Sequence, residues 1–128
     1  MDIFFQDQDE ARLPPEQVRL IQSQITPLHG TNRVKVFLEL TSFIKRPNIE
    51  IILSNGTGKV VAQTSILETM LRKLEITMHM GESEPGNEYT FESIVYYQKL
   101  PEPSDTPVVV PLPDPMIVDH RTAKFIFP

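Results

Sequence analysis

Three consecutive residues, Met78-His79-Met80, carry side chains that bind copper, since thioether and imidazole groups both coordinate this metal. Residues 73 to 80 alternate between apolar and polar side chains, which indicates a β-strand. Successive side chains of a strand point to opposite faces of the sheet, so the two methionines would enter the core while His79 points outward. We therefore expect core packing here, and the sequence predicts no metal and no cofactor.

Other chemically capable residues lack the context of a catalytic centre. Ser42, His79 and Asp119 could be combined into a nucleophilic triad, but none lies in a nucleophile-elbow sequence. Glu75 and Glu92 fall on the outward faces of expected strands, where a carboxylate is ordinarily solvated. The sequence thus predicts a protein that is not an enzyme.

The segment Asn48 to Ile66 is typical of a β-hairpin. Its centre, Gly56-Thr57-Gly58-Lys59, resembles part of a phosphate-binding loop, but that motif continues with Ser or Thr and a helix, whereas a strand pattern follows here. Glycine accepts the positive φ of a tight turn, and β-branched residues flank the loop on both sides. A four-residue loop would set Ile52 opposite Val61.

Alternating apolar and polar residues, separated by Gly, Pro and Asn, predict an all-β, antiparallel β-sandwich. Strands are expected at residues 33–41, 48–54, 59–65, 73–80 and 88–98. Residues 16–25 fit a strand or a helix, and the turn that follows favours the strand. A capping-box spacing at Ser65 to Glu68 predicts one helical turn between the sheets. The expected core contains Val36, Leu38, Leu40, Ile51, Leu53, Leu74, Ile76, Met78 and Val95.

Two features are similar to the immunoglobulin and fibronectin type III-like superfold. They are the Asn55-Gly56-Thr57-Gly58 hairpin and the entry into the penultimate strand at Gly86-x-x-Tyr89-Thr90-Phe91. The resemblance covers residues 16–99, without the cysteines and the central Trp of true immunoglobulin domains. It implies an immunoglobulin-like architecture and no particular activity.

Composition and charge narrow the function classes. The 128 residues are 40% hydrophobic and 23% charged, which suits one globular domain. The net charge is −5 and the basic residues form no stripe with aromatics, so nucleic acid is not an expected partner. No apolar run has the roughly 20 residues of a membrane helix, so no membrane insertion is expected. Without a signal-peptide pattern at Met1, a cytoplasmic location is the default expectation.

Proline divides the chain into three expected parts. Residues 1–14 would form an N-terminal arm, residues 15–100 the sandwich and residues 101–128 an extended tail. Seven of the twelve prolines lie in this tail, a density that opposes a helix or a central strand. The tail also carries apolar clusters, which disordered segments usually lack, so we expect it to dock on a surface.

Several apolar side chains are expected on the outer face of the sandwich, where they need cover. They are Phe37, Ile52, Val61, Ile94 and Tyr96. We expect Phe125 and Phe127 of the tail to pack against Phe37, Ile52, Val61 or Tyr96, in the same chain or in a second copy. The sequence therefore predicts a non-catalytic interaction or assembly module that binds a protein partner or forms a homo-oligomer. The alternative is a small accessory domain that binds a glycan or another ligand through loops near residues 28–32 and 81–87.

Overall fold

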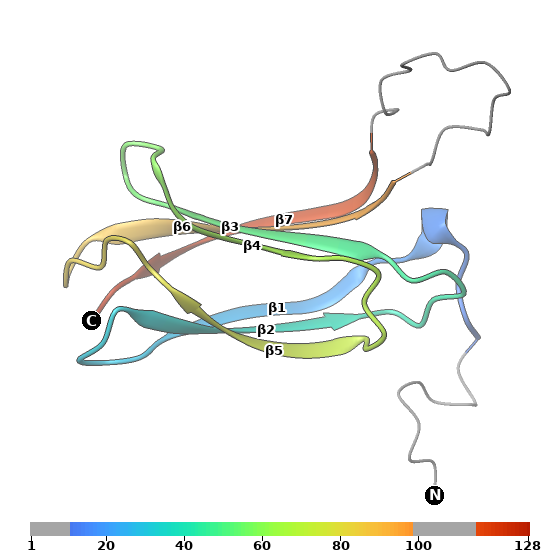
Figure 1. Ribbon diagram of the computed structural model, residues 1–128, viewed down its shortest axis with the longest axis horizontal. Coiled ribbons are helices and arrows are strands. Elements are labelled where there is room, and N and C mark those ends of the chain that lie inside the picture. The colour runs from blue at the N-terminus through green and yellow to red at the C-terminus, as the bar shows by residue number, and fades with distance from the viewer. Residues whose placement is uncertain (1–10, 99–114) are drawn as a thin grey trace, which may run out of the picture.

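The computed structural model describes residues 11–98 and 115–128, which form two antiparallel sheets packed face to face (Figure 1). The three-stranded sheet has the order β1 (Leu20–Pro27), β2 (Arg33–Leu40) and β5 (Lys73–His79). The four-stranded sheet has the order β4 (Val60–Ile66), β3 (Asn48–Ser54), β6 (Glu88–Tyr97) and β7 (Met116–Ile126). The predicted all-β antiparallel sandwich is confirmed.

The five strands predicted from alternation are present, each with bounds within one residue of the expectation. The ambiguous stretch from residue 16 becomes strand β1, preceded by the short 3-10 turn η1 (Pro15–Gln17). Proline suits the start of such a turn because its fixed φ is already that of a helix. In the described ranges, the structure contains no helix with the length and apolar character of a membrane span.

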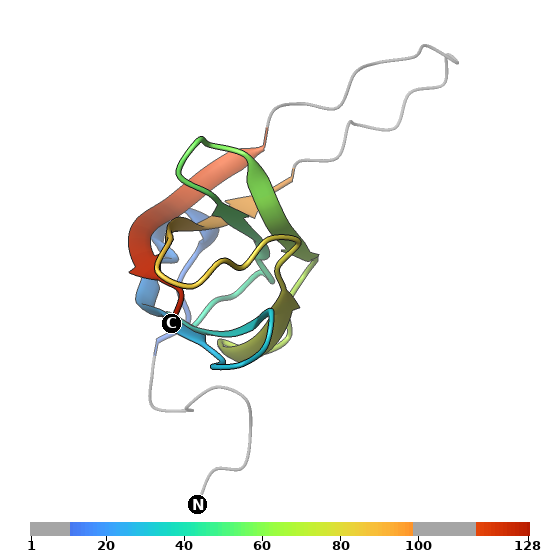
Figure 2. The same cartoon turned by 90° about the vertical axis from the view of Figure 1, so that its left-hand side faces the viewer.

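The end-on view shows the two sheets facing each other (Figure 2), and the buried side chains of the core come from both of them. In β6 every second residue from Tyr89 to Tyr97 is buried, as expected for a strand in the middle of a sheet. Seven of the nine expected core residues are buried; they are Val36, Leu38, Leu40, Ile51, Leu53, Met78 and Val95. Leu74 and Ile76 pack against this core but are only half-buried, because β5 is an edge strand. Their expected contact with the core is confirmed, but they are not fully buried.

Met78 and Met80 are buried and His79 is exposed. The alternation predicted from the sequence is therefore confirmed for these three residues.

The β3–β4 hairpin has one more loop residue than expected. Its loop runs from residue 55 to residue 59 and is closed by a hydrogen bond from Asn55 N to Lys59 O of 2.9 Å, with Gly58 at a φ of 88°. The pairing then shifts by one residue, so Ile52 faces Gln63 instead of Val61. The expected pairing of Ile52 with Val61 is wrong, because the bulge turns Val61 toward the core, where it packs.

The connection from β4 to β5 contains no helical turn, contrary to the capping-box expectation. Glu68 has a positive φ of 49°, which a right-handed helix does not allow. Its N–H donates to Asn48 Oδ1 at 2.8 Å, and Thr69 N donates to Pro47 O at 3.0 Å. Tertiary hydrogen bonds to the neighbouring loop replace those of a helix.

The expectation of an extended tail over residues 101–128 is wrong for its last part, which forms a strand of eleven residues. Residues 116–126 form β7, which pairs with β6 along its length and contains no proline. Residues 101–114 and residues 1–10 lie outside the described residues, so this part of the tail and most of the expected arm are untested. Within the arm, Leu13 forms a β-bridge with Phe43.

Phe125 and Phe127 pack on the core side of β6 and not on the expected outer face. The ring of Phe125 stacks on Tyr89 at 5.7 Å, and the ring of Phe127 meets Tyr89 edge-on at 6.5 Å. Phe127 is 2% exposed, and its backbone bonds to Asn87 and Gly86 in the β5–β6 connection. The chain end thereby closes one end of the sandwich.

Polar side chains close the side between β7 and β1. Asp119 Oδ2 accepts a hydrogen bond from Leu20 N at 2.8 Å, and Arg121 Nη2 donates to Leu20 O at 2.5 Å. Ser23 and Ser93 also share a hydrogen bond of 3.0 Å between the two sheets. The two bonds to Leu20 satisfy its backbone N–H and C=O groups beside a bulge in β1, whereas the serine pair joins the two sheets through side chains alone.

We predict that Phe127→Ala lowers the free energy of unfolding by about 3–5 kcal/mol, because a large buried ring is lost and a cavity remains. The neighbouring Ile126 is 62% exposed, so Ile126→Ala is the matched control and should change stability by about 0.5 kcal/mol or less. Denaturant unfolding of both variants checks this. Equal losses would show that the chain end does not pack as described.

Candidate functional site

The structure separates the five expected docking residues. Phe37 lies on β2, on the outer face of the three-stranded sheet, whereas Ile52, Ile94 and Tyr96 lie on the outer face of the four-stranded sheet. Val61 packs at the bulge against the core. All five side chains are half-buried. The outer face of the four-stranded sheet therefore holds the larger share of the expected surface.

On this face, residues from β3, β6 and β7 surround a hollow of about 270 Å³, which we call the Tyr96 hollow. It is lined by Glu50, Ile94, Tyr96, Gln98, Pro115 and Ile117. Ile94 stands between Glu50 and His120, and Tyr96 faces Ile117 across the β6–β7 ladder. Ile117 is 59% exposed, so the hollow has an open apolar wall.

Sequence reasoning missed Ile117, because residues 101–128 were assigned to a separate tail. The available signal was the apolar cluster Met116-Ile117-Val118, which is free of proline.

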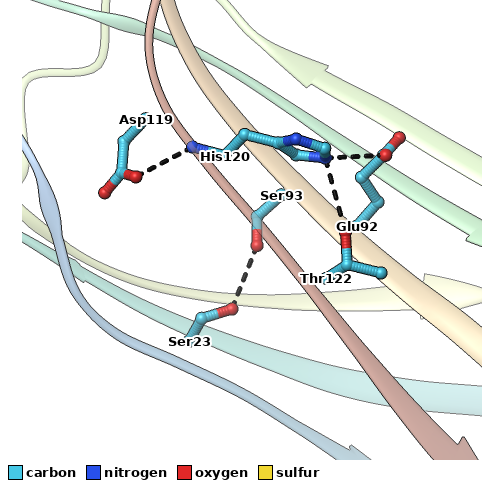
Figure 3. Close-up of polar contacts among 6 residues, drawn as sticks. All are labelled: Ser23, Glu92, Ser93, Asp119, His120 and Thr122. Atoms are coloured by element: carbon cyan, nitrogen blue, oxygen red, sulfur yellow. Dashed lines mark hydrogen bonds and ion pairs between the residues drawn. The ribbon is translucent and has the colours of Figure 1, made fainter.

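A cluster of three polar side chains, Glu92, His120 and Thr122, lies beside the hollow on β6 and β7 (Figure 3). His120 Nε2 lies 2.7 Å from Glu92 Oε2, and Thr122 Oγ1 lies 3.4 Å from the same nitrogen. Figure 3 also shows Ser93 on the other side of the sheet, bonded to Ser23. His120 thus has a carboxylate partner, but the serine nearest in the ladder points away from it.

The three residues combined above into a triad are not brought together. His79 pairs with Arg33 at the beginning of β2, while Ser42 follows the end of the same strand. The carboxylate of Asp119 binds backbone N–H groups, including that of Leu20.

The loops named for ligand binding meet at the opposite end of the sandwich. Met80 N donates to Asn32 O at 2.7 Å, which joins the β1–β2 and β5–β6 connections. A polar hollow of about 320 Å³ lies between the β5–β6 connection and the β3–β4 hairpin. Its aromatic residue, Tyr89, is 1% exposed, and its hydroxyl accepts a hydrogen bond from Glu84 N. A sugar ring would find no open aromatic face there, so this hollow is the weaker candidate.

Tyr97 fixes the part of β6 that carries the Tyr96 hollow. Its hydroxyl donates a hydrogen bond of 2.7 Å to Lys45 O, and Lys45 Nζ lies 5.8 Å from the centre of its ring. Burial raises the pKa of Tyr97 to about 12. Because the inward Tyr97 is anchored, its outward neighbours Tyr96 and Gln98 are held in a defined position.

No family model matches this sequence. No curated protein sequence matches it either. Solved structures of similar fold include a glycosyl hydrolase family 2 member from Bacteroides cellulosilyticus DSM 14838, with a TM-score of 0.56 at 10% identity. Another is Bifidobacterium dentium β-glucuronidase complexed with coumarin-3-O-glucuronide, with a TM-score of 0.54 at 15% identity.

Each match covers 86% of this chain, but only 15% and 18% of the two enzymes. At this identity the similarity establishes the fold, an immunoglobulin-like β-sandwich like those found within these longer chains.

We predict that the protein loses stability as the pH rises from about 10 to about 12, because Tyr97 keeps its proton in the folded state while the unfolded chain ionises. Below pH 10 both states are protonated and this contribution is fully present. Tyr97→Phe should remove this part of the pH dependence. Urea unfolding across that range measures it, together with tyrosinate absorbance, whose component near pH 12 should disappear in the variant. An unchanged slope in Tyr97→Phe would contradict the assignment.

Proposed function

We propose that this chain is a non-catalytic binding module that docks on another protein through the Tyr96 hollow. The observation that carries this proposal is the grouping of Ile94, Tyr96 and Ile117 around one open depression. An apolar centre with an aromatic residue is typical of the energetically important part of a protein interface.

The surroundings of the hollow support the same function. Glu50 stands at its wall, with Ser65 donating to Oε2 at 2.5 Å and Gln63 bonded to Oε1, so this carboxylate is held in place. The hydrogen bond between His120 and Glu92 and the ion pair of Lys124 with Glu88 give the same face polar surroundings. A partner of matching chemistry presents an aliphatic or aromatic side chain to Tyr96 and a hydrogen-bond donor to Glu50.

The two enzymes of similar fold support a role as one part of a larger assembly. In each of them a sandwich of this kind makes up less than a fifth of the chain. The partner of this module is accordingly a larger protein or a further domain, and the module contributes binding and not chemistry.

Site-specific crosslinking tests the proposal in cells that naturally produce the protein. A photoreactive amino acid at position 117 should give one discrete crosslinked product, whose second component is identified by mass spectrometry. The matched position is Lys35, which is exposed on the other sheet and should give none. No product at position 117, or the same product from both positions, would refute docking at this face.

Affinity for the purified partner then separates the two sheets. Tyr96→Ala should raise Kd about 30-fold, the effect of losing a hot-spot residue worth about 2 kcal/mol. Phe37→Ala removes a half-buried outward aromatic from the other sheet and should leave Kd unchanged. Calorimetry measures the Kd of both variants. A higher Kd for Phe37→Ala with an unchanged Kd for Tyr96→Ala would place the binding face on the sheet that contains β2.

A further inference from the structure

The four edge strands of the sandwich differ in their protection. Edge strands offer unpaired backbone groups to other chains, and proteins usually guard them with charges, proline, bulges or cover. β7 carries Asp119, Arg121 and Lys124, and it lies against β1 through the polar bonds described above. β1 ends in Pro27, and β5 carries Lys73 and Glu75.

β4 lacks most of these protective features. Its sequence, Val-Val-Ala-Gln-Thr-Ser-Ile, has no charge and no proline, and most of its residues favour strands. One bulge lies at its start, where Gly81 N donates to Val61 O at 2.8 Å. Beyond that point, among the residues that the structure describes, the backbone hydrogen bonds of Ala62 to Ile66 are those of the ladder with β3.

Apolar side chains accompany this edge. Ala62, Thr64 and Ile66 face the fully buried Leu53, Ile51 and Ile49 of β3, yet remain half-buried themselves. Leu74 and Ile76 on β5, the edge of the facing sheet, are half-buried in the same way.

Exposed apolar residues continue along the same edge and the β4–β5 connection. They are Val60, Leu67, Met70 and Leu71, with exposed fractions between 40% and 69%. Half of the large exposed apolar side chains in the described residues thus belong to one stretch of twelve positions, 60 to 71.

We infer that a second copy of this chain occupies the β4 edge, by antiparallel pairing of β4 with β4 about a two-fold axis at Thr64. This interface is distinct from the Tyr96 hollow. With this register Ala62 faces Ile66 of the second copy, Gln63 faces Ser65, and the two Thr64 residues face each other. Every pair is uncharged, and Thr–Thr and apolar pairs are among the favourable cross-strand combinations.

Charge at the two ends of β4 favours a second copy over an unrelated strand. Lys59 directly precedes β4 and Glu68 follows its last residue by two positions. Antiparallel self-pairing places the start of one β4 beside the end of the other, so Lys59 of each copy approaches Glu68 of its mate. The net charge of −5 opposes self-association in general, and the opposite charges at this edge counteract that repulsion locally.

Sedimentation equilibrium of the full chain tests the inference. The wild-type protein should form a dimer of twice its 14.7 kDa mass in a concentration-dependent manner. Thr64→Lys places two like charges at the two-fold axis and should raise the dimer dissociation constant about tenfold or more. Thr26→Lys is the matched control, because Thr26 is exposed on β1, the edge strand on the opposite side. It should leave the dimer intact.

A charge exchange keeps the test decisive if Thr64→Lys fails to fold, as judged by circular dichroism. Lys59→Glu and Glu68→Lys should each weaken the dimer about two- to tenfold, the range expected for exposed ion pairs. The double variant should restore it, because the charges then meet in reversed order. A monomer at every attainable concentration, a dimer that Thr64→Lys leaves unchanged, or a double variant no stronger than the single ones would overturn the inference.

Discussion

The backbone pairing of β6 with β7 ties the end of the chain to three separate regions of the sandwich. At one end it brings Phe127 against Tyr89 and fills the core. In the middle it sets Asp119 and Arg121 against the backbone of Leu20, which joins the two sheets. Near the other end it supplies Ile117 to the Tyr96 hollow. Loss of this one ladder would therefore open the core, separate β7 from β1 and remove the proposed binding face together.

Alternation of side chains predicts this fold well where a strand has neighbours on both sides. In β2, β3 and β6 the buried positions follow the expected period, because each of these strands has one face in the core. The edge strand β5 keeps the alternation, but its inward residues Leu74 and Ile76 are only half-buried. In β7 the positions opposite Val95 and Ser93 are Asp119 and Arg121, so the apolar alternation of this strand is interrupted in its middle. The prolines that precede β7 favour an extended tail, and this is why the sequence does not predict the strand.

The residues of the candidate site show what the periodicity of the sequence cannot predict. It identifies which residues point outward, but not which strands share a sheet, since strand order depends on contacts distant in the sequence. Phe37 and Tyr96 are both outward, yet they belong to opposite sheets. Val61 is displaced by a bulge that comes from one additional loop residue, a difference too small to recognise in the Gly-rich hairpin sequence. The hollow itself depends on Ile117, which only the β6–β7 pairing places beside Tyr96.

The two proposed surfaces do not compete for the same atoms. Side chains of the outer face stand perpendicular to the sheet, whereas edge hydrogen bonds lie within its plane. Self-pairing of β4 would thus leave both hollows open on one side of a continuous sheet. Neighbouring strands are about 4.8 Å apart, so the strand order places the two β6 strands roughly 24 Å from each other. A partner that offers two sites at this spacing would gain affinity from simultaneous binding, because the second contact forms at high effective concentration.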